Sequence, residues 1–157
     1  IFHCLKSQLM KNNRKNFVEI LLVEDNKHDA ELTMLALEEN KLANHVTWLR
    51  DGSEALDFLM GKGEHSDQDT PQNPKVILLD LKMPKIDGLE VLRRIRAEES
   101  TRHIPVVVLT SSREEKDLIQ SYKLGVNSYI VKPVEFDKFM ACIKEIGMYW
   151  AVINLTP

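Results

Sequence analysis

The chain has 157 residues, of which 43% are hydrophobic and 29% are charged, and its net charge is −3. This composition indicates a globular domain with a sizeable core, while the acidic balance argues against a nucleic-acid-binding protein, for which a basic surplus is expected. Apolar runs stay well below the roughly 20 residues that span a membrane, and Cys4 and Cys142 are typical of reduced thiols in a cytoplasmic protein rather than of a disulfide framework.

The domain organisation follows from where apolar periodicity begins. Met10 is followed by a polar run up to Asn16, so we expect residues 1–16 to be a flexible N-terminal extension, in part not native. Residues 17–157 then form one domain. The segment 61–75 is polar, contains two prolines and has no periodicity, which predicts a long surface loop. It is either a simple insertion or a loop that contacts a partner.

Five short apolar runs predict strands, and a helical pattern follows each of them. The expected strands are 17–23, 45–49, 76–80, 104–110 and 128–131. The expected helices are 29–40, with Leu32, Leu35, Ala36 and Leu37 at helical spacing; 53–60, starting at Ser53; 89–95, with Arg93, Arg94 and Arg96 on its solvated face; 113–124, closed by Gly125; and one from about 134 to 150. Strand–helix alternation of this kind predicts right-handed crossovers and a parallel sheet covered on both faces.

Functional groups stand at the ends of four of these strands. Glu24 and Asp25 follow the first, Asp80 ends the third, Thr110 ends the fourth and Lys132 follows the fifth. Because the carboxyl ends of parallel strands meet at one edge of the sheet, we expect these side chains to converge. Each of these residues alone would be an ordinary loop residue. Functional groups of complementary chemistry at four strand ends together favour a functional site.

The chemistry of this set favours phosphoryl transfer. Three carboxylates would repel one another unless a hard divalent cation lay between them, and an all-oxygen site suits Mg²⁺. Lys132 and Thr110 can neutralise phosphoryl oxygens, with Asp80 as the nucleophile. The open alternative is that Lys132 only pairs with the acids as a structural salt bridge.

Taken together, these motifs resemble the receiver domain of two-component response regulators. The resemblance covers residues 17–150 and rests on Leu22-Val23-Glu24-Asp25-Asn26, Leu79-Asp80-Leu81-Lys82-Met83-Pro84 with Asp87-Gly88, Thr110-Ser111 and Val131-Lys132-Pro133. It implies a five-stranded, doubly wound (βα)5 flavodoxin-like fold. It also implies Mg²⁺-dependent transfer of a phosphoryl group from a histidine kinase to Asp80.

The resemblance also implies individual roles. Asp25 would be the direct metal ligand and Glu24 the outer acid, with the Lys82 carbonyl as a third protein ligand. Thr110 and Tyr129 would form the switch pair, in which the hydroxyl moves towards the phosphoryl group and the ring turns in behind it. Alternatively, Tyr129 is an ordinary half-buried aromatic residue of a strand, without a role in switching. The chain would be a switch rather than an enzyme, assisting its own phosphorylation and slow autodephosphorylation.

Two features narrow the resemblance. The 61–75 loop and the apolar tail 148–154 are similar to those of single-domain regulators paired with bacterial phytochrome kinases, which dimerise through the last helix–strand face. Expected partners are therefore a phytochrome-type histidine kinase and a second copy, with no nucleic acid and no membrane. Lys82 departs from the common receiver pattern. A cation two residues after the acceptor could reach the phosphoryl group or obstruct the attacking water, so replacing it should change the lifetime of the phosphorylated form.

Other function classes fit less well. An aspartate-nucleophile phosphatase needs a second acid two residues after its nucleophile, where this chain has Lys82. A nucleotide-binding domain needs a glycine-rich loop after the first strand, where Glu24 and Asp25 stand. A receiver-like scaffold that is never phosphorylated would not need the complete set of acids, Thr110 and Lys132. A DNA-binding regulator is disfavoured because only a short apolar tail follows the last expected helix.

Overall fold

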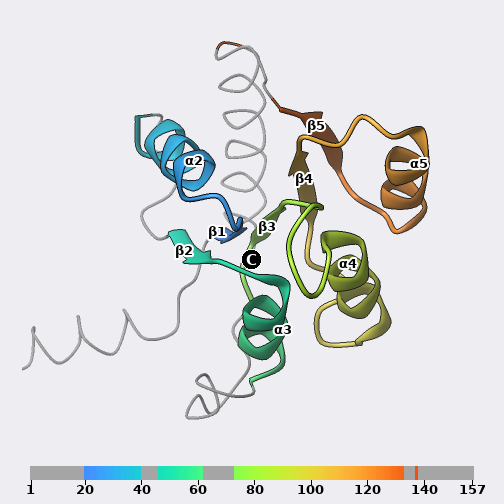
Figure 1. Ribbon diagram of the computed structural model, residues 1–157. Coiled ribbons are helices and arrows are strands. Elements are labelled where there is room, and N and C mark those ends of the chain that lie inside the picture. The colour runs from blue at the N-terminus through green and yellow to red at the C-terminus, as the bar shows by residue number, and fades with distance from the viewer. Residues whose placement is uncertain (1–19, 40–45, 62–72, 133–136, 138–157) are drawn as a thin grey trace, which may run out of the picture.

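The computed structural model describes residues 20–39, 46–61, 73–132 and 137 (Figure 1). The N-terminal extension, most of the 61–75 loop, the last expected helix apart from residue 137, and the apolar tail lie outside these residues. Within the described ranges, every helix is too short or too polar to cross a lipid bilayer.

Five parallel strands form one sheet in the order β2-β1-β3-β4-β5. They are β1 (Ile20–Val23), β2 (Val46–Leu49), β3 (Val76–Leu79), β4 (Val106–Thr110) and β5 (Ser128–Val131). The described helices are α2 (Lys27–Glu39), α3 (Gly52–Met60), α4 (Gly88–Ala97) and α5 (Glu115–Lys123). This strand order is the flavodoxin-like doubly wound arrangement, so the predicted fold class is confirmed.

The sheet is covered on both faces, as its continuous apolar strands require. Alternate residues of β1 separate the two layers: Leu21 and Val23 pack in the cluster that includes α3 and α4, while Ile20 and Leu22 pack with Leu37 of α2. Figure 1 shows α2 on one side of the strands and α3 and α4 on the other. The helical spacing of α2 located the helix but not its buried side, because Leu32 and Leu35 are about half exposed.

Several predicted helix ends differ from the structure by one or two residues. The first helix begins at Lys27 instead of residue 29, and the third spans Gly88–Ala97 instead of 89–95. The second helix begins at Gly52 instead of Ser53, because Asp51 is its N-cap and accepts a hydrogen bond from the Glu54 amide at 2.7 Å. The fourth begins at Glu115 rather than at residue 113, and Gly125 follows its last turn at φ +76°. That left-handed conformation explains why glycine stands there.

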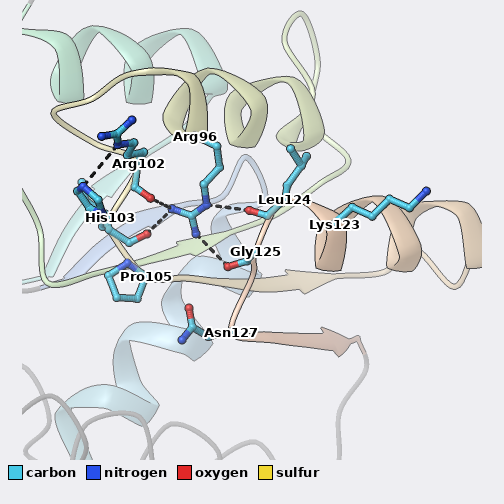
Figure 2. A pocket seen from close by; sticks show the side chains of 9 residues that line it. Arg96, Arg102, His103, Pro105, Lys123, Leu124, Gly125 and Asn127 are labelled. Carbon is cyan, nitrogen blue, oxygen red and sulfur yellow. Dashed lines mark hydrogen bonds between the residues drawn. The ribbon is translucent and has the colours of Figure 1, made fainter.

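Arg96 also departs from the sequence prediction. Arg93 and Arg94 are exposed, as expected, but Arg96 is half-buried. Its guanidinium donates to four carbonyl oxygens at 2.7–3.1 Å (Figure 2), those of Leu124, Arg102, Ile104 and Gly125. One side chain therefore joins the end of α4, the approach to β4 and the turn between α5 and β5. A planar fork of donors suits this task.

We expect Arg96→Lys to lower the free energy of unfolding by about 2 kcal/mol, because an ammonium cannot serve four carbonyls in this arrangement and leaves acceptors unsatisfied. Urea unfolding would measure the change. Arg94→Lys on the same helix is the matched control, since its exposed pair with Glu90 is worth at most about 1 kcal/mol. Equal losses in the two variants would contradict the role assigned to Arg96.

Candidate functional site

The predicted strand-end residues meet where the strand order reverses, between β1 and β3. Glu24 and Asp25 follow β1, and Asp80 follows β3 with its amide donating to the Val23 carbonyl at 3.0 Å. Crevices outside the carboxyl ends of strands at such a switch point are the usual binding sites of open α/β sheets. The convergence predicted from the sequence is therefore present.

The three acids differ in burial. Glu24 is 2% exposed and Asp80 is 6% exposed, whereas Asp25 is exposed to solvent. Each offers one carboxylate oxygen, and these three oxygens lie within 4.8 Å of one another. The Trp48 indole N–H fixes the first acidic loop by donating to the Glu24 carbonyl at 2.8 Å. The carboxylates of Glu24 and Asp80 are therefore almost fully buried beside the solvent-exposed carboxylate of Asp25.

The segment after Asp80 is held by a close backbone crossing. The Gly88 amide donates to the Leu81 carbonyl at 2.9 Å, and a Cβ at Gly88 would lie 2.2 Å from the Asp80 carbonyl oxygen. Any other residue would force the two backbone segments apart, so only glycine fits at this position. The side chain of Asp87 caps α4 by accepting from the Glu90 amide at 2.9 Å. The turn predicted around Asp87-Gly88 therefore positions the acidic residue.

Lys132 enters the cluster from the end of β5. Its ammonium donates to Glu24 Oε2 at 2.5 Å and to Asp29 Oδ2 at 3.1 Å. Sequence reasoning placed Asp29 only at a helix start and missed this contact. The sequence feature that could have indicated this contact is the position of Asp29, an acid in the first turn of the helix that directly follows β1.

Thr110 and Tyr129 are both tied to the loop after β4. Thr110 is fully buried and its hydroxyl accepts from the Ser112 amide at 3.2 Å. The Tyr129 hydroxyl donates to the Ser112 carbonyl at 3.1 Å, and its ring is half-buried against the core. Sequence reasoning assigned roles to Thr110 and Tyr129 but placed Ser112 only as a hydroxyl at the end of the fourth strand, with no role in joining them.

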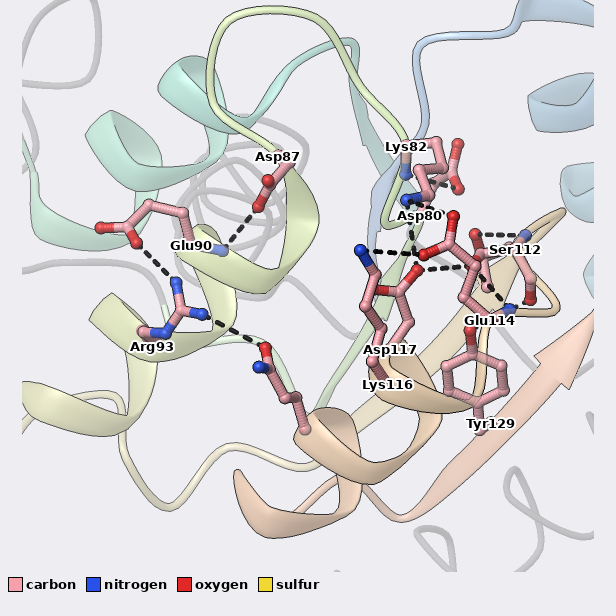
Figure 3. Close-up of polar contacts among 12 residues, drawn as sticks. Asp80, Lys82, Asp87, Glu90, Arg93, Ser112, Glu114, Lys116, Asp117 and Tyr129 are labelled. Carbon is pink, nitrogen blue, oxygen red and sulfur yellow. Dashed lines mark hydrogen bonds and ion pairs between the residues drawn. The ribbon is translucent and has the colours of Figure 1, made fainter.

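The Lys82 side chain turns towards α5 (Figure 3). Its amide donates to Asp80 Oδ1 at 3.3 Å, but its ammonium pairs with Asp117 at 3.2 Å and with Glu114 at 4.0 Å. The hydrogen bond to Asp117 raises the pKa of Lys82, so the ammonium stays charged. In this structure the cation therefore engages the neighbouring helix, which the sequence did not predict.

Electrostatics show that the acid cluster lacks compensating charge. Burial raises the pKa of Glu24 from 4.5 to about 7, with the nearby Asp80 charge adding to the effect against Lys132. Burial likewise raises the pKa of Asp80, although the Lys132 charge and hydrogen bonds from Glu24, Lys82 and Thr110 oppose it. Burial alone would lower the pKa of Lys132, but its bond to Glu24 and the acidic charges raise it. One ammonium thus faces several carboxylates.

These donors fit a hard divalent cation. All are carboxylate oxygens, two come from buried residues with raised pKa values, and their mutual spacing allows one ion to contact all three. Mg²⁺ takes few protein ligands and retains several waters, which suits a cluster open to solvent at Asp25. The Lys82 carbonyl as a further ligand stays a prediction.

The raised pKa of Glu24 predicts a pH dependence of the metal-free protein. The folded state holds a proton that the unfolded state loses above about pH 4.5, so this stabilisation is complete below that pH and disappears as the pH rises through about 7. The free energy of unfolding in the presence of a chelator should fall by roughly 3 kcal/mol over this range from Glu24.

Urea unfolding at several pH values measures this slope. Glu24→Gln should flatten it, whereas Glu31→Gln, at an exposed position of α2, should leave it as in the parent. Excess Mg²⁺ should also flatten it, because the ion binds the deprotonated acids. A slope that is the same in Glu24→Gln and the parent would contradict the assignment.

Residues 20–144 match the response regulator receiver domain family. The chain is 44% identical over 141 residues to the probable methanogenesis regulatory protein FilR2 of Methanothrix harundinacea, covering 88% of this chain and 86% of that protein. Among solved structures, the bacteriophytochrome response regulator RtBRR is 54% identical with a TM-score of 0.74, covering 90% of this chain and 85% of that one.

A metal-bound relative has a similar structure. The Mn²⁺-bound form of response regulator Rcp1, a protein of Synechocystis, is 40% identical with a TM-score of 0.74, covering 85% of this chain and 94% of that one. These likenesses extend over most of each protein. The chain therefore belongs to the response regulator receiver domain family and is a phosphoacceptor of two-component signalling.

Proposed function

We propose that Asp80 is the residue that accepts the phosphoryl group from a histidine kinase. The observation that carries this assignment is its buried carboxylate within 4.8 Å of the Glu24 and Asp25 carboxylates. An Asp80 oxygen would attack phosphorus as the bond to the kinase imidazole nitrogen breaks. The nitrogen keeps the electron pair, and the imidazole leaves neutral because its other ring nitrogen carries a proton. The aspartyl phosphate forms without an oxidant or reductant.

Glu24, Asp25, Asp80 and the Lys82 carbonyl would hold the metal. Bound there, Mg²⁺ supplies positive charge to the phosphoryl oxygens during transfer. Asp25 would ligate it directly, as the exposed acid of the cluster, and Glu24 would act from the outer side. The fit of an all-carboxylate donor set supports this assignment.

Lys132 and Thr110 would stabilise the charge of the transferred group. Lys132 already carries its ammonium next to Glu24 and Asp29, and it would exchange one of these partners for a phosphoryl oxygen. The buried Thr110 hydroxyl would donate to another. The Tyr129 hydroxyl donates to the carbonyl of Ser112, close to Thr110 in the chain. The Tyr129 ring would therefore change its packing when the Thr110 hydroxyl moves. The two residues would thus form the switch.

The chain would act as a switch with slow autodephosphorylation, in which water attacks the aspartyl phosphate. Lys82 would influence this step because it follows the acceptor by two positions. Since phosphoryl transfer from a kinase draws on ATP, we propose that the exchange takes place in the cytoplasm. The output is a change in partner binding.

The partner is a histidine kinase, and we propose that it is of the phytochrome type. RtBRR is a bacteriophytochrome response regulator, and its 54% sequence identity with this chain supports this pairing. We also propose that two copies associate through the last helix–strand face, since residues 148–154 are more apolar than one surface helix end needs. The negative net charge supports a function without nucleic acid.

Incubation with acetyl phosphate and Mg²⁺, followed by mass spectrometry, tests the assignment of Asp80. The protein should gain one phosphoryl group, and Asp80→Asn should gain none because an amide is not a nucleophile for this reaction. Chelation of Mg²⁺ should prevent the modification. Asp57→Asn on α3 is the matched control and should behave like the parent. Equal modification of Asp80→Asn and the parent would exclude Asp80 as acceptor.

A second measurement addresses Lys82. We expect the phosphorylated form of Lys82→Asn to lose its phosphoryl group at least about threefold faster, because a shorter neutral side chain leaves the path of the attacking water open (about 0.65 kcal/mol in barrier). Release of inorganic phosphate after removal of the donor gives the rate. A rate that does not change would show that the Lys82 side chain does not influence the lifetime.

A further inference from the structure

Helix α5 has an inverted distribution of polar and apolar residues. Its buried positions are Asp117 and Ser121, whereas Leu118, Ile119 and Tyr122 are 38%, 45% and 52% exposed. Among the described residues, the Ser121 hydroxyl finds no hydrogen-bond partner. An amphipathic helix normally docks through an apolar stripe. The side of α5 that faces the protein instead makes polar contacts: those of Asp117 with two other segments, and a hydrogen bond that Gln120 accepts from the Arg93 guanidinium of α4 at 3.3 Å.

Asp117 is held by two donors on two other segments. Its carboxylate accepts from the Ser112 hydroxyl at 2.5 Å and pairs with the Lys82 ammonium at 3.2 Å. Burial would raise the pKa of Asp117, but these two hydrogen bonds lower it, so the group is charged. Asp117 is only 4% exposed, and a buried charge needs such partners. Loss of Lys82 would leave it undercompensated.

Each partner of Asp117 leads to a different part of the site (Figure 3). Through its amide, Lys82 donates to Asp80 Oδ1 at 3.3 Å. Ser112 donates to the Thr110 hydroxyl through its amide and accepts from Tyr129 through its carbonyl. A continuous set of contacts therefore runs from Asp80 through Lys82 and Asp117 to Ser112, where both switch residues are attached.

We propose that Asp117 is a positioning residue for phosphorylation: it holds α5 and Ser112 against the Lys82 ammonium, and a phosphoryl group on Asp80 releases α5 by drawing that ammonium away. This inference rests on the proposed role of Asp80. A phosphoryl group carries about two negative charges and forms two residues from Lys82. The cation now faces Asp117, Glu114 and Asp87. The new charge therefore competes with three carboxylates, of which only that of Asp117 is buried.

A purely local role for Asp117 makes a different prediction. An acid in the first turn of a helix stabilises that helix through its dipole, whatever Lys82 does. The proposal instead requires that removing Asp117 and removing the Lys82 charge have the same effect, and that the second removal adds nothing to the first. A double-mutant cycle separates the two cases.

Amide hydrogen exchange over Glu115–Lys123, followed by mass spectrometry, is the readout. Before phosphorylation, Asp117→Asn and Lys82→Met should each raise the exchange rate of this segment at least about fivefold over the parent, and the double variant should match the single ones. Lys82 is half exposed, so its replacement does not disturb the core even where Asp117→Asn lowers stability. Lys116→Met removes an exposed cation that pairs with Glu114 and should leave exchange as in the parent.

Acetyl phosphate and Mg²⁺ supply the second half of the test. Phosphorylation should raise exchange over α5 in the parent and in Lys116→Met, but should add less than about twofold in Asp117→Asn or Lys82→Met, where the tie is already broken. Equal increases in all four proteins would overturn the proposal, as would α5 exchange that Lys82→Met leaves unchanged. Should the parent fail to take up a phosphoryl group at Asp80, the proposed acceptor is wrong, whereas the comparison of unphosphorylated variants still decides whether Lys82 and Asp117 hold α5.

Discussion

The structure depends most on the placement of buried carboxylates at the junction of β1 and β3. Burial of Glu24 and Asp80 disfavours their charged forms, and the nearby Lys132 compensates only one negative charge. The fold itself imposes this cost, because two adjacent parallel strands end there and the close backbone crossing at Gly88 holds the segment after Asp80 in place. Such a site is stable only when protons or a cation balance it, which makes its state responsive to whatever binds.

The sequence correctly predicted which site residues lie together where their position follows from the order of the strands. Glu24, Asp25, Asp80, Thr110 and Lys132 could be placed together because each ends a strand of one parallel sheet, and the structure brings them to one edge. The α3 start was misplaced by one residue since Asp51 and Ser53 are both good caps, and only the backbone decides between them. Apolar spacing likewise located α2 but could not say that Leu32 and Leu35 face away from the sheet.

Contacts made by long side chains could not be predicted in this way. Arg96 has the same residue type and helical neighbourhood as Arg93 and Arg94, yet it alone of the three turns back to the carbonyls around the α5–β5 turn. Lys82 was recognised as unusual, but its reach covers several directions, and only the position of Asp117 on α5 selects one. Residue identity gives the charge of these groups, while the packing of neighbouring helices determines their partners.

The inverted polarity of α5 connects the site to the rest of the surface. A helix docked through apolar residues would resist a change in charge, because apolar burial is insensitive to it. A helix docked through Asp117 responds directly, since one of the two partners of Asp117 is Lys82, two residues after the acceptor. The half-exposed Leu118, Ile119 and Tyr122 lie on the same helix, so a change in its docking alters an apolar surface. Charge at Asp80 can thus be converted into a change of the surface that a partner would meet.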